Sequence, residues 1–215
     1  AVAGHRDHVA LLLMCVNHEY TDAGIMFPHS RDEGRPDSRT VTDIEMACNG
    51  GSVIEIRKTG GRWRQVEDSP YARRINAFDT RMRISGPAAG HSRMRTSTDP
   101  EGRNVIGTLN NCAGGITPWG TYLMAEENFN KYFAGRLRGH PEQPSFARYG
   151  VPGNGFAWGR HHRRFDINRE PMEANRFGWI VEVDPLDPAT TPVKRTALGR
   201  FKHEGAACII NRDGR

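Results

Sequence analysis

The chain has 215 residues, enough for one domain with a full hydrophobic core or for two small domains. A hydrophobic content of 37% and a mean hydropathy of −0.65 describe a polar protein, and no apolar run approaches the length that crosses a bilayer. The net charge of +5 could suggest a nucleic-acid partner, but 25 acidic residues lie among the 30 basic ones. The densest basic patch is His161 to Arg164. Because no aromatic stacking pattern accompanies it, we interpret this patch as a solvated loop.

Glycine and proline are abundant, at 24 and 13 residues, which favours an all-β fold of short strands joined by turns. The first expected strand is the apolar run His8 to Val16, which leads into Glu19. Gly24 to Ser38 is rich in turn residues. Thr40 to Asn49 carries apolar residues at helical spacing before a Gly-Gly pair, and this pattern predicts one short helix.

The middle of the chain predicts further strands. Ser52 to Glu67 has two strand-like runs around a second Gly-Gly pair and indicates a hairpin. Tyr71 to Pro100 is expected to be irregular, with one short strand near Met82 to Ile84. A strand at Asn104 to Leu109 then leads into the most distinctive part of the sequence.

Asn110 to Phe129 reads NNCAGGITPWGTYLMAEENF. It places a lone cysteine, Cys112, in a predicted loop of Asn, Gly and Pro, followed by an expected strand at Trp119 to Met124. That strand leads to two carboxylates, Glu126 and Glu127. Because strand ends and their loops display reactive groups, a thiolate and a carboxylate placed in this way predict a metal site.

The last third of the chain predicts a long irregular segment and two strands. Aromatic residues are spread among Gly and Pro from Asn130 to Pro171, and we expect them to hold a long loop against the body of the protein. Strands are expected at Phe177 to Val183 and at Arg195 to His203.

Glutamates follow several expected strands. NHEY, AEEN and KHEG place Glu19, Glu127 and Glu204 at equivalent points of successive sheet units. Antiparallel units separated by variable loops are typical of a β-propeller with insertions, and the chain has enough sheet for two to three blades. An isolated glutamate at a strand end is commonly only solvated, so the argument for a site depends on their joint occurrence.

Four cysteines, Cys15, Cys48, Cys112 and Cys208, show no CxxC spacing, which argues against a zinc ribbon or a disulfide scaffold. Cys15 and Cys208 lie in apolar runs and are expected to be structural, whereas the small polar neighbours of Cys112 leave its thiol open to a cation. Carboxylates suit Ca2+ and Fe3+, and a thiolate argues against a purely calcium site. His18 and His203 are equally compatible with binding metal, orienting a neighbouring glutamate or facing solvent.

The sequence resembles the PhoX-type alkaline phosphatases. The resemblance is carried by NNCAGGITPWGTYLMAEENF, by LMCVNHEYTD at Leu13 to Asp22 and by LGRFKHEGAA at Leu198 to Ala207, long phrases in a fixed order, and it extends with gaps over nearly the whole chain. It implies a metal-dependent phosphomonoesterase that releases inorganic phosphate from small organic phosphate esters through a metal-activated oxygen nucleophile.

The resemblance also implies a six-bladed propeller with long loop insertions, whose centre holds two Fe3+ and three Ca2+ ions. Residues 1–215 would be one partial propeller, the N-terminal to central part of a longer catalytic domain. Cys112 matches the family's iron-binding cysteine, Glu127 and Glu204 match metal-binding glutamates, and Glu126 and Glu19 are further candidates. The Arg and Lys that grip substrate phosphate are expected past Arg215, so none is assigned.

Ala1 is not a start methionine, no signal sequence precedes the first strand, and the last residues follow an apolar run directly. We therefore interpret the chain as a fragment that is inactive alone, from a family exported by the twin-arginine route to the periplasm or medium and monomeric at full length. Two alternatives stay open. One is a calcium-dependent, lactonase-like propeller hydrolase, which iron content would distinguish, and the other is a non-catalytic propeller that binds a polyanion with steep salt dependence.

Overall fold

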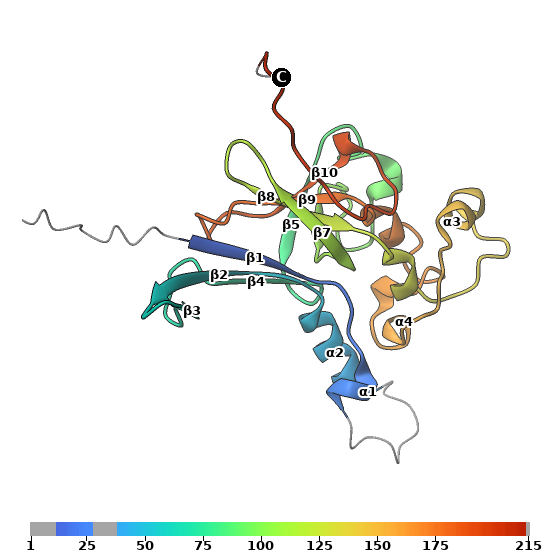
Figure 1. Cartoon of the computed structure of the whole chain (residues 1–215). Coiled ribbons are helices and arrows are strands. Elements are labelled where there is room, and N and C mark those ends of the chain that lie inside the picture. Colours follow the sequence, from blue (N-terminus) through green and yellow to red (C-terminus); the bar gives the residue numbers. More distant parts are fainter. Residues whose placement is uncertain (1–11, 28–37, 214–215) are drawn as a thin grey trace, which may run out of the picture.

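The first of two β-sheets is antiparallel and is formed by the N-terminal part of the chain. The computed structural model describes residues 12–27 and 38–213 (Figure 1). In this sheet β2 pairs with β1, β3 and β4. The strands are β1 (Leu12–His18), β2 (Gly50–Thr59), β3 (Arg62–Gln65) and β4 (Arg73–Asn76). The expected hairpin is confirmed, with Gly60 and Gly61 at positive φ in the turn between β2 and β3.

The second sheet has six strands in the order β6-β5-β10-β9-β8-β7. All neighbours are antiparallel except β5 and β10, which are parallel. The strands are β5 (Arg81–Ser85), β6 (Asn104–Ile106), β7 (Asn111–Ile116), β8 (Tyr122–Glu126), β9 (Ile180–Val183) and β10 (Val193–Arg195). Short strands near Met82, Asn104 and Ile180 agree with the sequence-based predictions.

Both sheets pack on one hydrophobic core, to which the first sheet contributes Ile75, the second Met82, Met124 and Val181, and the helix α2 Met46. The two sheets also touch directly, because the hydroxyl of Tyr122 on β8 donates a hydrogen bond to Asn17 Oδ1 on β1 at 3.0 Å. β1 therefore lies close to β7 and β8 (Figure 1).

The predicted helix is confirmed as α2 (Arg39–Cys48). Ser38 caps its start by accepting a hydrogen bond from the N–H of Val41 at 3.2 Å, and the helix ends at Asn49 before Gly50. The other short helices are α1 (Ala23–Met26), α3 (Gln143–Tyr149), α4 (Trp158–His161) and five 3-10 turns, Ser92–Met94, Phe129–Tyr132, Arg163–Phe165, Glu173–Arg176 and Thr196–Leu198. No helix in these described ranges is long and apolar enough to cross a bilayer.

The long segment after β8 contains short helices where only irregular chain was expected, but its aromatic residues have the expected role. Tyr132, Phe133, Phe146, Trp158 and Phe165 are all fully buried. Tyr132 stacks on Phe156 with ring centroids 4.5 Å apart, and Trp158 meets Phe165 edge to face. These rings hold the segment beside the sheets (Figure 1).

Several local predictions are wrong. Tyr71 to Pro100 contains β4 (Arg73–Asn76) in addition to the one short strand expected near Met82. Cys112 lies in strand β7 and not in a loop, because Gly114 and Gly115 serve close packing: a Cβ on either would overlap the carbonyl oxygen of Leu123 or Ala206. The strand expected at Arg195 to His203 ends at Arg195, where a 3-10 turn begins and Gly199 takes a φ of +84°. Parts of His8 to Val16 and of Gly24 to Ser38 lie outside the described residues.

The cysteines differ from each other in exposure. Cys15 is half-buried and packs against the main core, as expected of a structural thiol. Cys208 is exposed, which corrects the expectation that its apolar run is buried. All four cysteines are free thiols in this structure.

The prediction of a mostly β fold is confirmed. In the described part of the chain the strands form a sheet of four and a sheet of six, and these do not close into a barrel or a propeller. The parallel pairing of β5 with β10 departs from the purely antiparallel blades of the expected arrangement.

Candidate metal centre

Three of the predicted ligands meet at one place. Ligand atoms of Glu19, Cys112 and Glu127 all lie within 4.8 Å of one another. Glu19 follows β1, Cys112 lies on β7 and Glu127 follows β8, so each comes from a different strand. All three side chains are half-buried, which keeps them sheltered yet open to a small ligand.

The β7–β8 hairpin brings Cys112 to Glu127. The strands pair with Asn111 opposite Glu126 and Gly114 opposite Met124, and a register shift lies between these two pairs. The irregularity falls on Cys112 and Ala113. Because a bulge locally turns the strand and re-aims its side chains, this shift sets the direction of the Cys112 thiol.

Asn110 connects the two glutamates. It has a φ of +50°, a left-handed conformation that Asn tolerates better than most residues. Its side-chain amide donates to the carbonyl of Glu19 at 3.2 Å, and its own carbonyl accepts from the N–H of Glu127 at 3.0 Å. Its Oδ1 accepts from the N–H of Asn128 at 2.5 Å. Asn110 therefore fixes the backbone at both Glu19 and Glu127.

Further polar residues, buried or half-buried, hold Asn110 and Cys112. Asn49 Oδ1 accepts from the N–H of Asn110 at 3.3 Å and from the hydroxyl of Tyr132 at 3.0 Å. Asn17 donates to the carbonyl of Cys112 at 2.7 Å. Sequence reasoning did not single out these supporting residues, although Asn17 and Asn110 stand inside the quoted motifs.

Two of the three acidic groups, Glu19 and Cys112, have raised pKa values. The pKa of Glu19 is raised by burial and next by the charge of Glu127, while the nearby Lys131 partly opposes the shift. The pKa of the Cys112 thiol is raised by burial and by the charges of Glu19 and Glu127. Without a cation the ionised forms of these groups are therefore disfavoured, and a bound cation would reverse that preference.

Glu126, also a predicted ligand, lies elsewhere. Its carboxylate is fully buried, with Oε1 2.7 Å from Lys194 Nζ. Oε2 accepts from the N–H groups of Gly178 and Trp179 at 2.9 and 3.0 Å, and Thr108 donates to Oε1 at 2.8 Å. These partners give Glu126 a structural role in the core.

Glu204 lies beside the group but outside it. Its carbonyl accepts from the N–H of Ala113 at 2.7 Å, so the backbone of Glu204 lies beside the residue that follows Cys112. Its side chain is exposed, and it is not part of the three-residue group. Glu204 is thus adjacent to the site through its backbone.

The two histidines contact other partners. His18 Nε2 lies 2.9 Å from Ser52 Oγ, and His203 Nε2 lies 3.0 Å from the carbonyl oxygen of Gly199. The pKa of each is lowered, mainly by burial. Neither belongs to the three-residue group.

The sequence model of a family described as alkaline phosphatase PhoX matches residues 1–215. The chain belongs to the alkaline phosphatase PhoX family. The resemblance carried by the three motifs is thereby confirmed. No curated protein shows significant similarity to the chain.

A solved PhoX structure is also similar to this chain. It is that of Pseudomonas fluorescens PhoX in complex with vanadate, described as a transition state analogue. The sequence identity is 46% and the TM-score is 0.89 over 99% of this chain. The chain covers 36% of the length of that PhoX.

The donor set of this PhoX family member suits metal. Two carboxylates offer hard oxygen ligands, and a thiolate is a strong donor to a transition metal such as iron. Their mutual repulsion, seen in the raised pKa values of Glu19 and Cys112, is what a cation would relieve. The residues present therefore fit a bound metal cation, and the thiolate fits a transition metal better than calcium.

Proposed function

We propose that this chain is part of a metal-dependent phosphomonoesterase that releases inorganic phosphate from small organic phosphate esters. The observation that carries the proposal is the convergence of Glu19, Cys112 and Glu127 in a chain of the alkaline phosphatase PhoX family. Because the chain covers 36% of the similar PhoX structure, the activity of the whole protein is proposed from this part.

In this proposal Glu19, Cys112 and Glu127 hold Fe3+ and Ca2+. When bound, the metal ions supply positive charge that neutralises the phosphoryl oxygens of the ester and lowers the pKa of the attacking water. The chain's own contribution is to fix the ligands. Asn110 holds the backbone of both glutamates and is itself held by Asn49, and Asn17 holds the backbone of Cys112.

Of the two other predicted ligands, Glu204 and Glu126, we keep only Glu204 as a proposed metal ligand. Glu204 remains a proposed ligand, since its backbone lies beside β7 and its exposed side chain is not committed to an ion pair among the described residues. Glu126 is instead held by Lys194 and two backbone N–H groups, so we propose that it stabilises the fold and leaves the metal to Glu127.

Membership of the alkaline phosphatase PhoX family also supports proposals on the architecture and the location of the whole protein. We propose that residues 1–215 correspond to two to three blades of a six-bladed propeller, of which the two described sheets are part. The family resemblance further supports a protein of the periplasm or medium that is exported by the twin-arginine route and acts as a monomer.

A chimera provides the test. Residues 1–215 would replace the matching part of Pseudomonas fluorescens PhoX, and hydrolysis of p-nitrophenyl phosphate and metal content would be measured. We expect activity that a chelator removes, and iron together with calcium in the purified protein. Cys112→Ser in the same chimera should lose iron and most of the activity. A folded chimera with calcium but no iron would favour the lactonase-like alternative.

A second cysteine substitution in the chimera separates a general effect of losing a thiol from a specific effect at the metal site. Cys208→Ala changes an exposed thiol in the same background and serves as the matched control. We expect it to keep the metal content and rate of the parent chimera. Equal activity in the Cys112→Ser chimera would show that the thiolate does not serve the metal site.

A further inference from the structure

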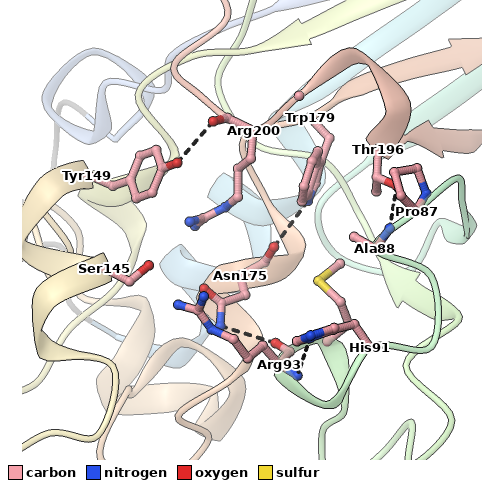
Figure 2. A pocket seen from close by; sticks show the side chains of 12 residues that line it. Pro87, Ala88, His91, Arg93, Ser145, Tyr149, Asn175, Trp179, Thr196 and Arg200 are labelled. Carbon is pink, nitrogen blue, oxygen red and sulfur yellow. Dashed lines mark hydrogen bonds between the residues drawn. The ribbon is translucent and has the colours of Figure 1, made fainter.

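A cavity of about 450 Å³ lies apart from the three-residue group. Figure 2 shows its lining side chains, which come from the loop after β5, from α3 and from the segments on either side of the strand pair β9 and β10. None of Glu19, Cys112 and Glu127 lines it. Its volume falls within the range of pockets that bind small molecules.

Arg200 brings a positive charge to this cavity. Its Nε donates to the carbonyl of Phe177 at 2.8 Å and its Nη2 to that of Ala174 at 2.8 Å. These bonds fix the guanidinium without neutralising it. Within residues 12–27 and 38–213, Arg200 forms no ion pair with a carboxylate, and Tyr149 is the first group that opposes the lowering of its pKa.

The surroundings leave this charge under-compensated. Burial lowers the pKa of Arg200 to about 10, so the group stays protonated at neutral pH at some cost in solvation. The guanidinium lies 4.3 Å from the ring centroid of Tyr149 and 5.0 Å from that of Phe129. Aromatic faces compensate a cation only in part, and an anion would do so more fully.

No acidic side chain lines the cavity among its described residues. Arg93, the other arginine, is paired with Glu142, whose carboxylate its Nε contacts at 2.9 and 3.1 Å. His91 lies on the same side and accepts a hydrogen bond from the N–H of Arg93 at 3.2 Å. The charge available to a ligand is therefore that of Arg200.

The walls are largely apolar and are fixed. The indole N–H of Trp179 already donates to the carbonyl of Asn175 at 3.1 Å, and the hydroxyl of Tyr149 donates to the carbonyl of Arg200 at 3.0 Å (Figure 2). The rings of both therefore present apolar surface to the cavity. Met94 and Pro87 complete the apolar lining.

We propose that this cavity binds a small organic anion whose phosphate or carboxylate contacts Arg200 and whose flat apolar part lies between Trp179, Tyr149 and Met94. The site is distinct from the metal centre and does not depend on the proposed phosphatase activity. It requires only the cation, the apolar walls and the space between them.

Calorimetric titration of the 215-residue chain tests the proposal. A chelator in every solution prevents anions from binding through a metal. The probes are phenylphosphonate and benzoate, with benzyl alcohol as the uncharged counterpart and inorganic phosphate as the counterpart without a ring. We expect saturable binding of one or both organic anions, stronger than that of either counterpart. The stronger of the two anions identifies phosphate or carboxylate as the natural head group.

Three variants complete the experiment. Arg200→Met should weaken binding by about tenfold or more, since a charge-assisted contact is lost. Ser145→Leu fills the cavity and should block binding while keeping Arg200, which covers the case in which Arg200→Met does not fold. Arg148→Met removes an exposed positive charge of α3 outside the cavity and should bind like the parent.

The proposal is overturned if the parent chain shows no saturable binding of either organic anion, or if Ser145→Leu binds them as tightly as the parent. It is also overturned if benzyl alcohol binds as well as the anions, because Arg200 would then contribute nothing. Inorganic phosphate binding as tightly as phenylphosphonate would remove the role given to Trp179 and Tyr149.

Discussion

Oε1 of Glu126 lies 2.7 Å from Nζ of Lys194, and neither side chain has any exposed surface, at 0% each. Glu127, the next residue, shares the three-residue group with Glu19 and Cys112. Successive residues of an extended chain point to opposite sides. The end of β8 therefore sends one carboxylate into the core and the next one to the candidate metal site.

Exchanging each of these carboxylates for an amide should separate stability from metal binding. Glu126→Gln leaves the buried Lys194 without its counter-ion and should lower the free energy of unfolding by about 3–5 kcal/mol. Glu127→Gln removes a repulsive charge from a half-buried group and should leave the stability of the metal-free chain nearly unchanged, while weakening iron binding. Urea denaturation and metal titration of both variants provide the check. Equal losses of stability would contradict the division of roles.

Asn110 should matter to the metal site beyond its backbone conformation. Asn110→Gly keeps the left-handed φ accessible but removes the side-chain bonds to Glu19 and Asn128. We expect metal affinity to fall by about tenfold, as for other residues that orient ligands. Asn154 also has a φ of +50° and lies outside the site, so Asn154→Gly is the control. If both variants bind metal alike, the side chain of Asn110 does not position the ligands.

Cys112 should give the metal site its colour. A thiolate bound to Fe3+ produces a charge-transfer band in the visible spectrum, and Cys112→Ser should abolish or shift that band and lower the iron content. Glu127→Gln should reduce iron but leave the band in whatever iron remains. Cys208→Ala should change neither property, and Cys15→Ala should cost only about 1 kcal/mol of packing. The check is a visible spectrum and metal analysis of each variant in the chimeric protein. An unchanged band and iron content in Cys112→Ser would contradict the prediction.

Glu45 should make stability depend on pH. Burial raises its pKa above 4.5, although the indole N–H of Trp158 donates to it at 2.9 Å and partly opposes the shift. The folded state therefore binds more protons than the unfolded state just above pH 4.5, and stability falls as pH rises through that region. Glu45→Gln removes this loss and should be more stable than the parent at pH 7.

The stability difference between Glu45→Gln and the parent should vanish near pH 3, below the ordinary pKa of glutamate, where both side chains are neutral. Glu67→Gln alters an exposed carboxylate and serves as the control, for which no difference is expected at either pH. Urea denaturation at the two pH values measures the effect. A Glu45→Gln variant that is less stable at both pH values would show that the carboxylate is stabilised in the fold.

The meeting of Cys112 and Glu127 is predictable because a cysteine among turn residues is followed by a short strand that leads to carboxylates. Glu19 is predictable as a further candidate because it follows an apolar run. The choice between Glu126 and Glu127 was harder, since it depends on which face each side chain occupies. The expected strand stopped at Met124, whereas β8 continues to Glu126. Side chains along a strand point alternately to its two faces. An error of one residue in the position of the strand therefore swaps the glutamate that faces the core with the one that faces the metal site.

Other features depend on contacts that no local pattern records. The bond between Asn110 and Asn49 joins residues 61 positions apart in the chain, and the composition around Asn49 predicts only the end of a helix. Similarly, Gly114 and Gly115 read as turn residues, although their function is to let Leu123 and Ala206 approach. Close packing and turning both favour glycine, so sequence alone does not distinguish them.

Strand β10 consists of three residues, Val193–Arg195, yet it joins the β5–β6 pair to the β7–β8–β9 group. It is also synthesised after the other nine strands of the described residues. On the ribosome, the two groups of strands would therefore wait unpaired at one edge until residues 193–195 have been synthesised. Pairings between distant parts of a chain slow folding, so this short strand sets a high contact order for the whole sheet. Newly made protein would depend on chaperones during that interval more than a sheet of sequential hairpins does.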